Sequence, residues 1–219
     1  MERLPSKTNL IFEPYTTNVP EAVLRALLVM GNRLGNCEPT WLVGGSCGVL
    51  LQGVELNAVP RDLDVYVDAV RAETVHRALA PYSIDDQTYS ETGMYGSLLS
   101  HYSIEGVQVE LVGSLQVRLD EGEYEVRVQS LLASFAQAGL IRGATIRFMP
   151  LVHELVFNVL RDRRDRYEPL AEAMRGHPER HLPALDELLR TNRIGKRYAD
   201  RLNDLLHVSS GRKGSEDES

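Results

Sequence analysis

Two aspartates separated by one residue, Asp62 and Asp64, form the pattern in this sequence best suited to chemistry. Leu63 and Val65 alternate with them, as in a strand with one apolar face. Residues two apart in a strand point to the same side, roughly 7 Å apart, so both carboxylates leave from one face. Such carboxylates repel unless a cation neutralises them, and magnesium is commonly held by one or two carboxylates together with substrate phosphates. The pair predicts a divalent-cation site; the alternative is a solvent-facing strand edge.

A glycine-rich turn, Gly44, Gly45 and Ser46, lies between an apolar run at 40–43 and a short helical pattern at 47–52. Glycine lets the backbone come close to a ligand, and the start of a helix presents unpaired amides that suit phosphate. Taken alone, the turn is better explained as a tight connection between a strand and a helix.

A third acid, Glu110, interrupts an apolar stretch at 107–112. A buried, unpaired carboxylate is costly, so this acid should have a cation or a hydrogen-bond donor nearby. The position is explained equally well by a functional acid or by a salt bridge at the rim of the core.

The hydrophobic pattern also predicts the elements that must position these residues. The expected order is a helix at 20–34, a strand at 40–43, a helix at 47–52, a strand at 63–67, a helix at 69–79, strands at 98–104, 107–112, 114–119, 124–128 and 144–148, and helices at 151–162, 167–174, 182–191 and 195–207. Residues 81–97 are polar and turn-rich and carry no predicted element. The segments 105–106 and 120–123 are predicted hairpin turns, which favour antiparallel pairing.

This order predicts a mixed α/β (α+β) fold with a largely antiparallel sheet. The expected division is a core at 1–150, a C-terminal helical subdomain at 151–208 and a disordered tail at 209–219, whose composition cannot support a core.

Composition narrows the classes of protein further. The 219 residues are 43% hydrophobic and 25% charged, which is ordinary for a globular chain with a real core. The net charge of -7 arises mainly within residues 1–150 and disfavours a long nucleic acid as partner. Two cysteines suit a reducing compartment. We find neither a signal-peptide pattern nor an apolar run of membrane-spanning length, so we expect a cytoplasmic protein without a membrane partner.

The ordered set of turn, acid pair and third acid resembles the nucleotidyltransferase superfamily whose best-known member is DNA polymerase beta. The resemblance covers roughly residues 20–170 and is closest to the small bacterial nucleotidyltransferases. It implies that two magnesium ions are bound by Asp62, Asp64 and Glu110, and that Glu110 helps deprotonate the acceptor. It also implies roles in binding phosphate or supporting the site for Gly44, Gly45, Ser46 and Arg61.

The resemblance implies a magnesium-dependent enzyme that transfers a nucleoside monophosphate from a nucleoside triphosphate, with ATP the expected case, to a hydroxyl of an unidentified small molecule or macromolecule. Two features depart from the family pattern: fifteen residues separate Ser46 from Asp62, and the third acid is Glu rather than Asp. They favour the alternative, a catalytically silent nucleotide-binding module or a toxin–antitoxin-type interaction module of the same fold. The oligomeric state is left open.

An arginine-rich turn follows the predicted helix at 151–162. Arg161, with Asp165 and Glu168, matches a spacing of the same family. The other arginines, at 163, 164 and 166, are either ligands of a triphosphate or anionic acceptor or members of a solvated, self-paired Arg/Asp turn. Both interpretations remain open at this point.

Overall fold

The structure is a computed structural model that describes residues 11–35, 37–38, 40–56, 60 and 62–206. The helices within those residues are α1 (Glu21–Leu34), α2 (Gly45–Leu51), α3 (Ala69–Leu79), α4 (Leu151–Leu160), α5 (Arg164–Arg175), α6 (Pro178–Thr191) and α7 (Lys196–Leu206), with short 3-10 turns at Ala80–Tyr82 and Leu132–Ser134. The strands are β1 (Ile11–Phe12), β2 (Leu42–Gly44), β3 (Asp62–Val67), β4 (Thr88–Thr92), β5 (Tyr95–Ile104), β6 (Val107–Leu119), β7 (Gly122–Glu125), β8 (Gln137–Ile141) and β9 (Ala144–Phe148).

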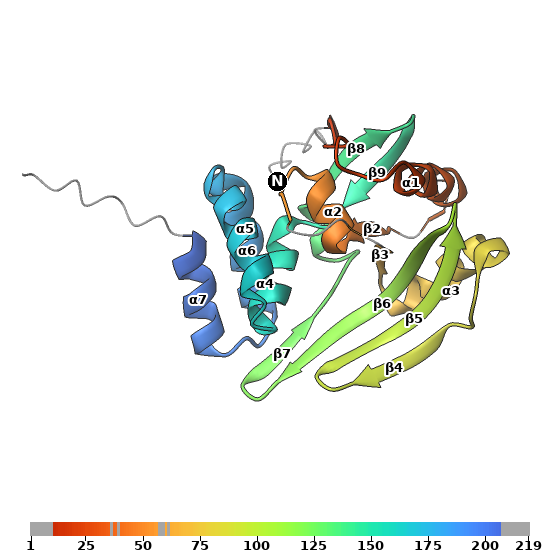
Figure 1. Ribbon diagram of the computed structural model, residues 1–219. Helices are drawn as coiled ribbons and strands as arrows, with labels where there is room; N and C mark the ends of the chain where they lie inside the picture. The colour runs from red at the N-terminus through yellow and green to blue at the C-terminus, as the bar shows by residue number, and fades with distance from the viewer. Residues whose placement is uncertain (1–10, 36, 39, 57–59, 61, 207–219) are drawn as a thin grey trace, which may run out of the picture.

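The strands form one sheet in the order β1-β8-β9-β2-β3-β6-β5-β4, and β7 pairs with the far end of β6 (Figure 1). Three pairs are parallel, β1 with β8, β2 with β9 and β3 with β6, and the other neighbours are antiparallel. The predicted mixed, largely antiparallel sheet is therefore confirmed.

Helices cover both faces of this sheet, and side chains of β3 pack against the helices on each face. Its residues Leu63 and Val65 are buried in the cluster that includes α1 and α3. Tyr66, of opposite parity, is buried in the other cluster, which includes α4 to α7. Because successive side chains of a strand alternate between faces, Asp62 and Asp64 lie on the side of the α4 layer.

The structure corrects the sequence prediction in three segments. Residues 81–97, predicted to be irregular, contain β4 and the start of β5, and β8 was not predicted at all. The side chains of β4 are almost all exposed, so no apolar alternation marks the strand, and its ladder with β5 is what defines it. The two strands predicted around 107–119 are the single strand β6, with a left-handed residue at Ser114.

The predicted boundary at residue 150 coincides with the start of the helical series, but the helices do not have a core of their own. Buried residues of α4 to α7 share one cluster with Leu42, Val112 and Val117 of the sheet. The division into domains remains a prediction, and the tail at 209–219 lies outside the described residues. Among the helices in the described part of the chain, none combines the length and apolar character needed to cross a membrane.

Replacing Leu63 tests the packing that holds the acid pair in place. Leu63 lies between the two aspartates in the sequence, and its side chain is fully buried on the opposite face of β3. Leu63→Ala should therefore lower the free energy of unfolding by about 2–5 kcal/mol, measured by urea denaturation. Val70→Ala is the control, because Val70 is 88% exposed and its truncation should change stability by less than about 0.5 kcal/mol. Equal midpoints for the two variants would contradict the packing described for β3.

Candidate active site

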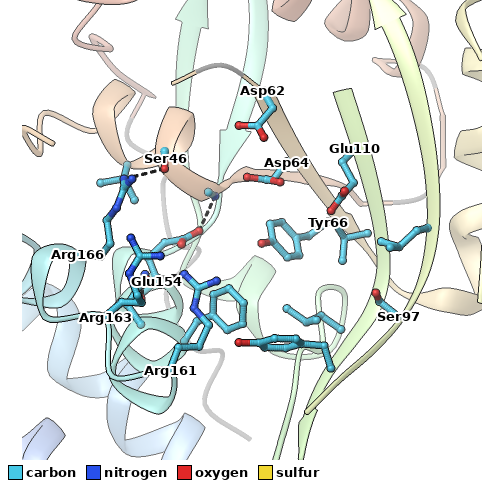
Figure 2. Close-up of a pocket in the computed structure, with 18 of the residues that line it drawn as sticks. Ser46, Asp62, Asp64, Tyr66, Ser97, Glu110, Glu154, Arg161, Arg163 and Arg166 are labelled. Carbon is cyan, nitrogen blue, oxygen red and sulfur yellow. Dashed lines mark hydrogen bonds between the residues drawn. The ribbon is translucent and has the colours of Figure 1, made fainter. Parts of the chain in front are cut away.

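The parallel pairing of β3 with β6 brings the predicted acids together. Asp64 is the register partner of Glu110, and Asp62 is that of Gln108. Asp62, Asp64 and Glu110 all line one cavity of about 470 Å³. Figure 2 shows their carboxylates along one wall of this pocket, with arginines from the helical layer facing them.

The cavity lies between the α4-side face of the sheet, the start of α2, and α4 with the turn that follows it. Its lining residues are Gly45, Ser46, Val49, Leu56, Asp62, Asp64, Tyr66, Ser90, Thr92, Tyr95, Ser97, Leu99, Glu110, Val112, Leu115, Glu154, Phe157, Asn158, Arg161, Arg163, Arg166 and Leu170. Gly44 is not among them, and Arg61 lies outside the described residues.

Asp64 is the carboxylate whose surroundings are least favourable to a negative charge. Burial raises its pKa to about 7, with further contributions from the carboxylates of Asp62, Glu154 and Glu110, while the Arg161 guanidinium acts in the opposite direction. Among the described residues, the Asp64 side chain makes no hydrogen bond and no ion pair. A partly buried acid without a hydrogen-bond partner, near three other carboxylates, creates a demand for a cation.

These residues fit a magnesium ion that is shared with a substrate. Within the described part of the chain, no three His, Cys, Asp or Glu side chains converge as a ready-made metal cage. Mg²⁺ does not require such a cage, because it is typically bound by one or two carboxylates, waters and substrate phosphates. The unpaired oxygens of Asp64 and its neighbours are donors of the hard type that this ion prefers.

The glycine turn is folded tightly around Asp64. Gly45 has a φ of +62°, and a Cβ there would overlap Asp64 Oδ2, so this position requires glycine. Its N–H donates to Glu154 Oε1 at 2.7 Å, and the hydroxyl of Ser46 accepts from Arg166 Nη1 at 3.0 Å. Two of the groups predicted to bind phosphate, the Gly45 N–H and the Ser46 hydroxyl, therefore have protein partners in this structure.

Glu154 of α4 is a site residue that the sequence analysis did not single out. Its side chain lines the cavity although the residue is only 3% exposed. Burial raises its pKa to about 7, against the opposing effects of the Gly45 N–H and of Arg161. The available signal was an acid within the apolar run Leu151–Leu160, where a charged residue needs a partner.

The four arginines between the end of α4 and the first turn of α5 divide into two groups. Arg163 is paired with Asp165, with nitrogen–oxygen distances of 2.8 and 3.0 Å, and Arg164 with Glu168 at 2.7 Å. The interpretation as a self-paired turn thus holds for these two, although Arg163 also lines the cavity.

Arg161 and Arg166 are directed to the pocket. The guanidinium of Arg161 lies over the Phe157 ring, 4.1 Å from its centroid, and donates to Asn158 Oδ1 at 2.8 Å. Among the described residues Arg161 forms no ion pair, so it is a cation available to an anionic ligand. Arg166 donates to Ser46 as noted above, and its Nε lies 3.5 Å from Asp165 Oδ2.

Two residues next to these motifs are structural. Cys47 is fully buried, and burial raises the pKa of its thiol to about 12, which excludes a ready nucleophile. Asp68, which follows β3, accepts hydrogen bonds from the backbone N–H groups of Val128 and Gln129, so it anchors a loop.

Comparison with known proteins places this geometry in a fold. No family model matches the sequence, and no curated protein is similar to it. Among solved structures, that of a Thermotoga maritima protein provisionally assigned as a nucleotidyltransferase superposes with a TM-score of 0.59 at 23% identity, covering 73% of this chain and 96% of that one. The chain therefore has the nucleotidyltransferase fold, and the predicted resemblance is confirmed at that level.

Two antibiotic-modifying proteins superpose less well. The lincosamide antibiotic adenylyltransferase LnuA, solved with lincomycin bound, gives a TM-score of 0.42 at 16% identity, covering 70% of this chain and 98% of that one. The antibiotic-resistance factor ANT(2'')-Ia gives 0.48 at 12% identity, covering 83% and 96%.

The raised pKa of Glu154 predicts how stability depends on pH without divalent ions. The unfolded chain loses this proton near pH 4.5 and the folded chain near pH 7, so the folded state binds more protons between these values and stability falls as pH rises. The effect of Glu154 amounts to about 3 kcal/mol. Glu154→Gln keeps an acceptor for Gly45 and should reduce the fall in chelator-treated protein, measured by urea unfolding from pH 4.5 to 7.5.

Glu172→Gln is the control for that measurement, because Glu172 lies on the exposed side of α5 and should leave the pH profile unchanged. A Glu154→Gln profile with the wild-type slope would contradict the electrostatic description of this side chain.

Proposed function

We propose that the protein is a magnesium-dependent nucleotidyltransferase that transfers a nucleoside monophosphate from a nucleoside triphosphate, with ATP the expected donor, to a hydroxyl of an acceptor. The observation that carries this proposal is the arrangement of Asp62, Asp64 and Glu110 along one wall of a cavity whose opposite wall bears Arg161 and Arg166. An acidic wall suits metal ions, and a cationic wall suits the phosphates that these ions share.

In this mechanism the residues of the chain bind, orient and accept a proton. Arg161, which has no ionic partner among the described residues, binds the triphosphate. Arg166 and Ser46 line the same cavity. Glu110 accepts the proton of the acceptor hydroxyl; the acceptor oxygen forms a bond to the α-phosphorus while the bond to the leaving pyrophosphate breaks. Magnesium, held by Asp62 and Asp64, would supply neutralisation of charge and polarisation of the phosphoryl oxygens.

The wall beyond the acids suits an uncharged part of a substrate. On the same face of the sheet, the row of Asp64 and Glu110 is followed by the row of Tyr66, Val112 and Leu99. Hydroxyl groups of the paired residues Ser90 and Ser97, and of Thr92, lie farther along. This pattern favours a small, hydroxyl-bearing acceptor over a polynucleotide, in agreement with the net charge of -7.

A catalytically silent nucleotide-binding module of the same fold is the second candidate. The observation that favours it is the engagement of the Gly45 N–H by Glu154 and of the Ser46 hydroxyl by Arg166. The stretch of fifteen residues between Ser46 and Asp62 and the Glu at position 110 also depart from the pattern of the family that this chain resembles. Calorimetry with a non-hydrolysable ATP analogue and Mg²⁺, combined with an assay for pyrophosphate release, separates the two: binding without release indicates the module.

Replacement of the acids tests the catalytic proposal. Asp62→Asn or Asp64→Asn should reduce transfer of label from an α-labelled nucleoside triphosphate by about 10²–10³-fold, as when one electrostatic contact to a transition state is removed. Glu73→Gln is the control, since Glu73 is an exposed acid of α3 whose side chain is 75% accessible. Wild-type transfer in either aspartate variant would refute the assignment.

Replacement of Arg161 tests the phosphate wall. Hydrogen bonds to charged groups contribute about 1.5–3 kcal/mol, so Arg161→Gln should raise the Kd for the ATP analogue about 10–100-fold in calorimetry. Arg164→Gln is the matched control, because Arg164 at the start of α5 is paired with Glu168 and does not line the cavity. Equal affinities in the two variants would remove Arg161 from the binding site.

A further inference from the structure

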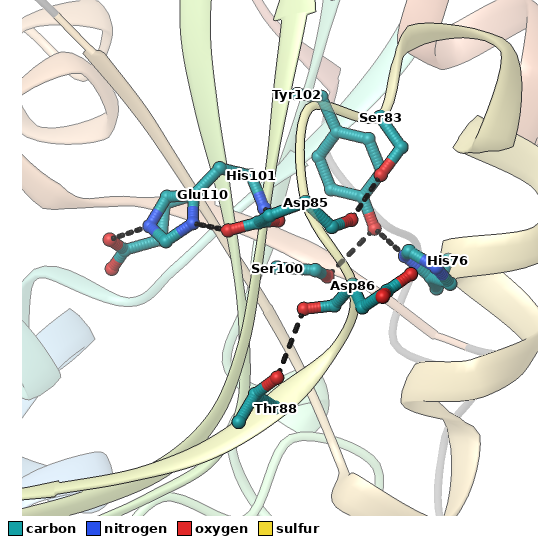
Figure 3. A network of polar contacts seen from close by, with 9 residues as sticks. All are labelled: His76, Ser83, Asp85, Asp86, Thr88, Ser100, His101, Tyr102 and Glu110. Carbon is teal, nitrogen blue, oxygen red and sulfur yellow. Dashed lines mark hydrogen bonds and ion pairs between the residues drawn. The ribbon is translucent and has the colours of Figure 1, made fainter.

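The proposed base Glu110 is in contact with a histidine and, through it, with a second acid. His101 Nε2 lies 3.1 Å from Glu110 Oε2, and His101 Nδ1 lies 2.5 Å from Asp85 Oδ2. Asp85 Oδ1 also accepts the backbone N–H of His101 at 2.6 Å. Figure 3 shows these three side chains in line, with the imidazole between the two carboxylates.

We propose that Asp85 and His101 are positioning residues that fix the carboxylate of Glu110 for reaction with the acceptor hydroxyl. The inference rests on the proposed function of the site. His101 holds the oxygen Oε2, and the other oxygen, Oε1, has no hydrogen-bond partner among the described residues. Because Glu110 lines the cavity and His101 does not, the histidine acts through the glutamate rather than on a substrate.

The sheet provides the framework for this contact. His101 of β5 and Glu110 of β6 are register partners in an antiparallel pair, so their side chains leave from the same face side by side. Glu110 is in turn the parallel partner of Asp64, so a single row across three strands runs from histidine to glutamate to aspartate.

Asp85 is held in place by the backbone around it. The N–H of Ile84 donates to the carbonyl of His101 at 3.0 Å, and Ser83 forms an isolated bridge with Tyr102. The hydroxyl of Ser83 also donates to the carbonyl of Asp85 at 2.6 Å. These bonds hold the segment before β4 against β5 next to His101, the residue that the Asp85 carboxylate contacts.

The glutamate has a physical need for such support. Its side chain has one more rotatable bond than that of Asp64, and side-chain freedom must be lost before a base can act in one geometry. A carboxylate that accepts from a held imidazole has lost part of this freedom before the substrate arrives. The departure from an aspartate at this position is therefore matched by a supporting pair that fixes the longer side chain.

Kinetics of histidine variants test the proposal. His101→Ala should lower kcat for nucleotide transfer about 10–100-fold, the loss typical of groups that orient a ligating or reacting residue. The KM for the triphosphate should change less than about 3-fold, because the phosphate wall is untouched. His101→Gln, whose amide can donate in place of Nε2, should recover at least about 3-fold of the lost kcat.

A double-mutant cycle separates positioning from general stability. If His101 acts through Glu110, His101→Ala should cause no further loss of kcat in a Glu110→Gln background. His177→Ala is the control, because the His177 side chain is 60% accessible, precedes α6 and does not line the cavity, so its loss should leave kcat unchanged. Additive losses, or a kcat of His101→Ala equal to that of wild type, would overturn the proposal.

A readout independent of activity tests the contacts themselves. The wild-type protein and two variants are labelled with ¹⁵N-histidine. Relative to wild type, the Glu110→Gln variant should show a shifted Nε2 resonance of His101, and the Asp85→Asn variant a shifted Nδ1 resonance. A His101 ring insensitive to both changes overturns the positioning proposal even if transfer is observed. If the wild-type protein transfers no nucleotide while the resonances respond as expected, the proposed function fails and the contacts stand.

Discussion

Repulsion among carboxylates at the junction of β3 and β6 is the constraint on which the rest of the site depends. The parallel register of β3 and β6 pairs Asp64 with Glu110 and so places like charges on one face of the sheet. Their neighbours compensate for this in different ways: Arg161 supplies a positive charge across the cavity, and His101 binds an oxygen of Glu110. The site thus consists of a destabilising cluster and the groups that make it tolerable.

The parts of this arrangement that could be predicted from the sequence are those with a local cause. Asp62 and Asp64 alternate with apolar residues, and the alternation alone places both on one face of a strand. Glu110 was found because an acid is conspicuous in an apolar strand. The mixed, largely antiparallel sheet followed from the order of elements and from turn residues, which are likewise properties of short segments.

The parts that could not be predicted depend on contacts between distant segments. Glu154 belongs to the site only because α4 brings it to the N–H of Gly45, 109 residues earlier in the chain. His101 lies beside Glu110 only because of the register between β5 and β6. Asp85 precedes β4, a strand whose exposed residues carry no hydrophobic pattern. The local propensities of the residues do not predict such contacts, because tertiary packing determines them.

The hydrogen bond between Gly45 and Glu154 also has a consequence for synthesis on the ribosome. The glycine turn and the acid pair emerge early, whereas α4, which supplies Glu154, and the segment that supplies Arg161 and Arg166 emerge about a hundred residues later. Contacts of this sequence separation form late, because a long loop must close before they stabilise anything. A nascent or prematurely terminated chain therefore exposes its acids without the wall that faces them. Under the proposed function, a chain that ends before Arg166 therefore lacks the cationic wall and should transfer no nucleotide.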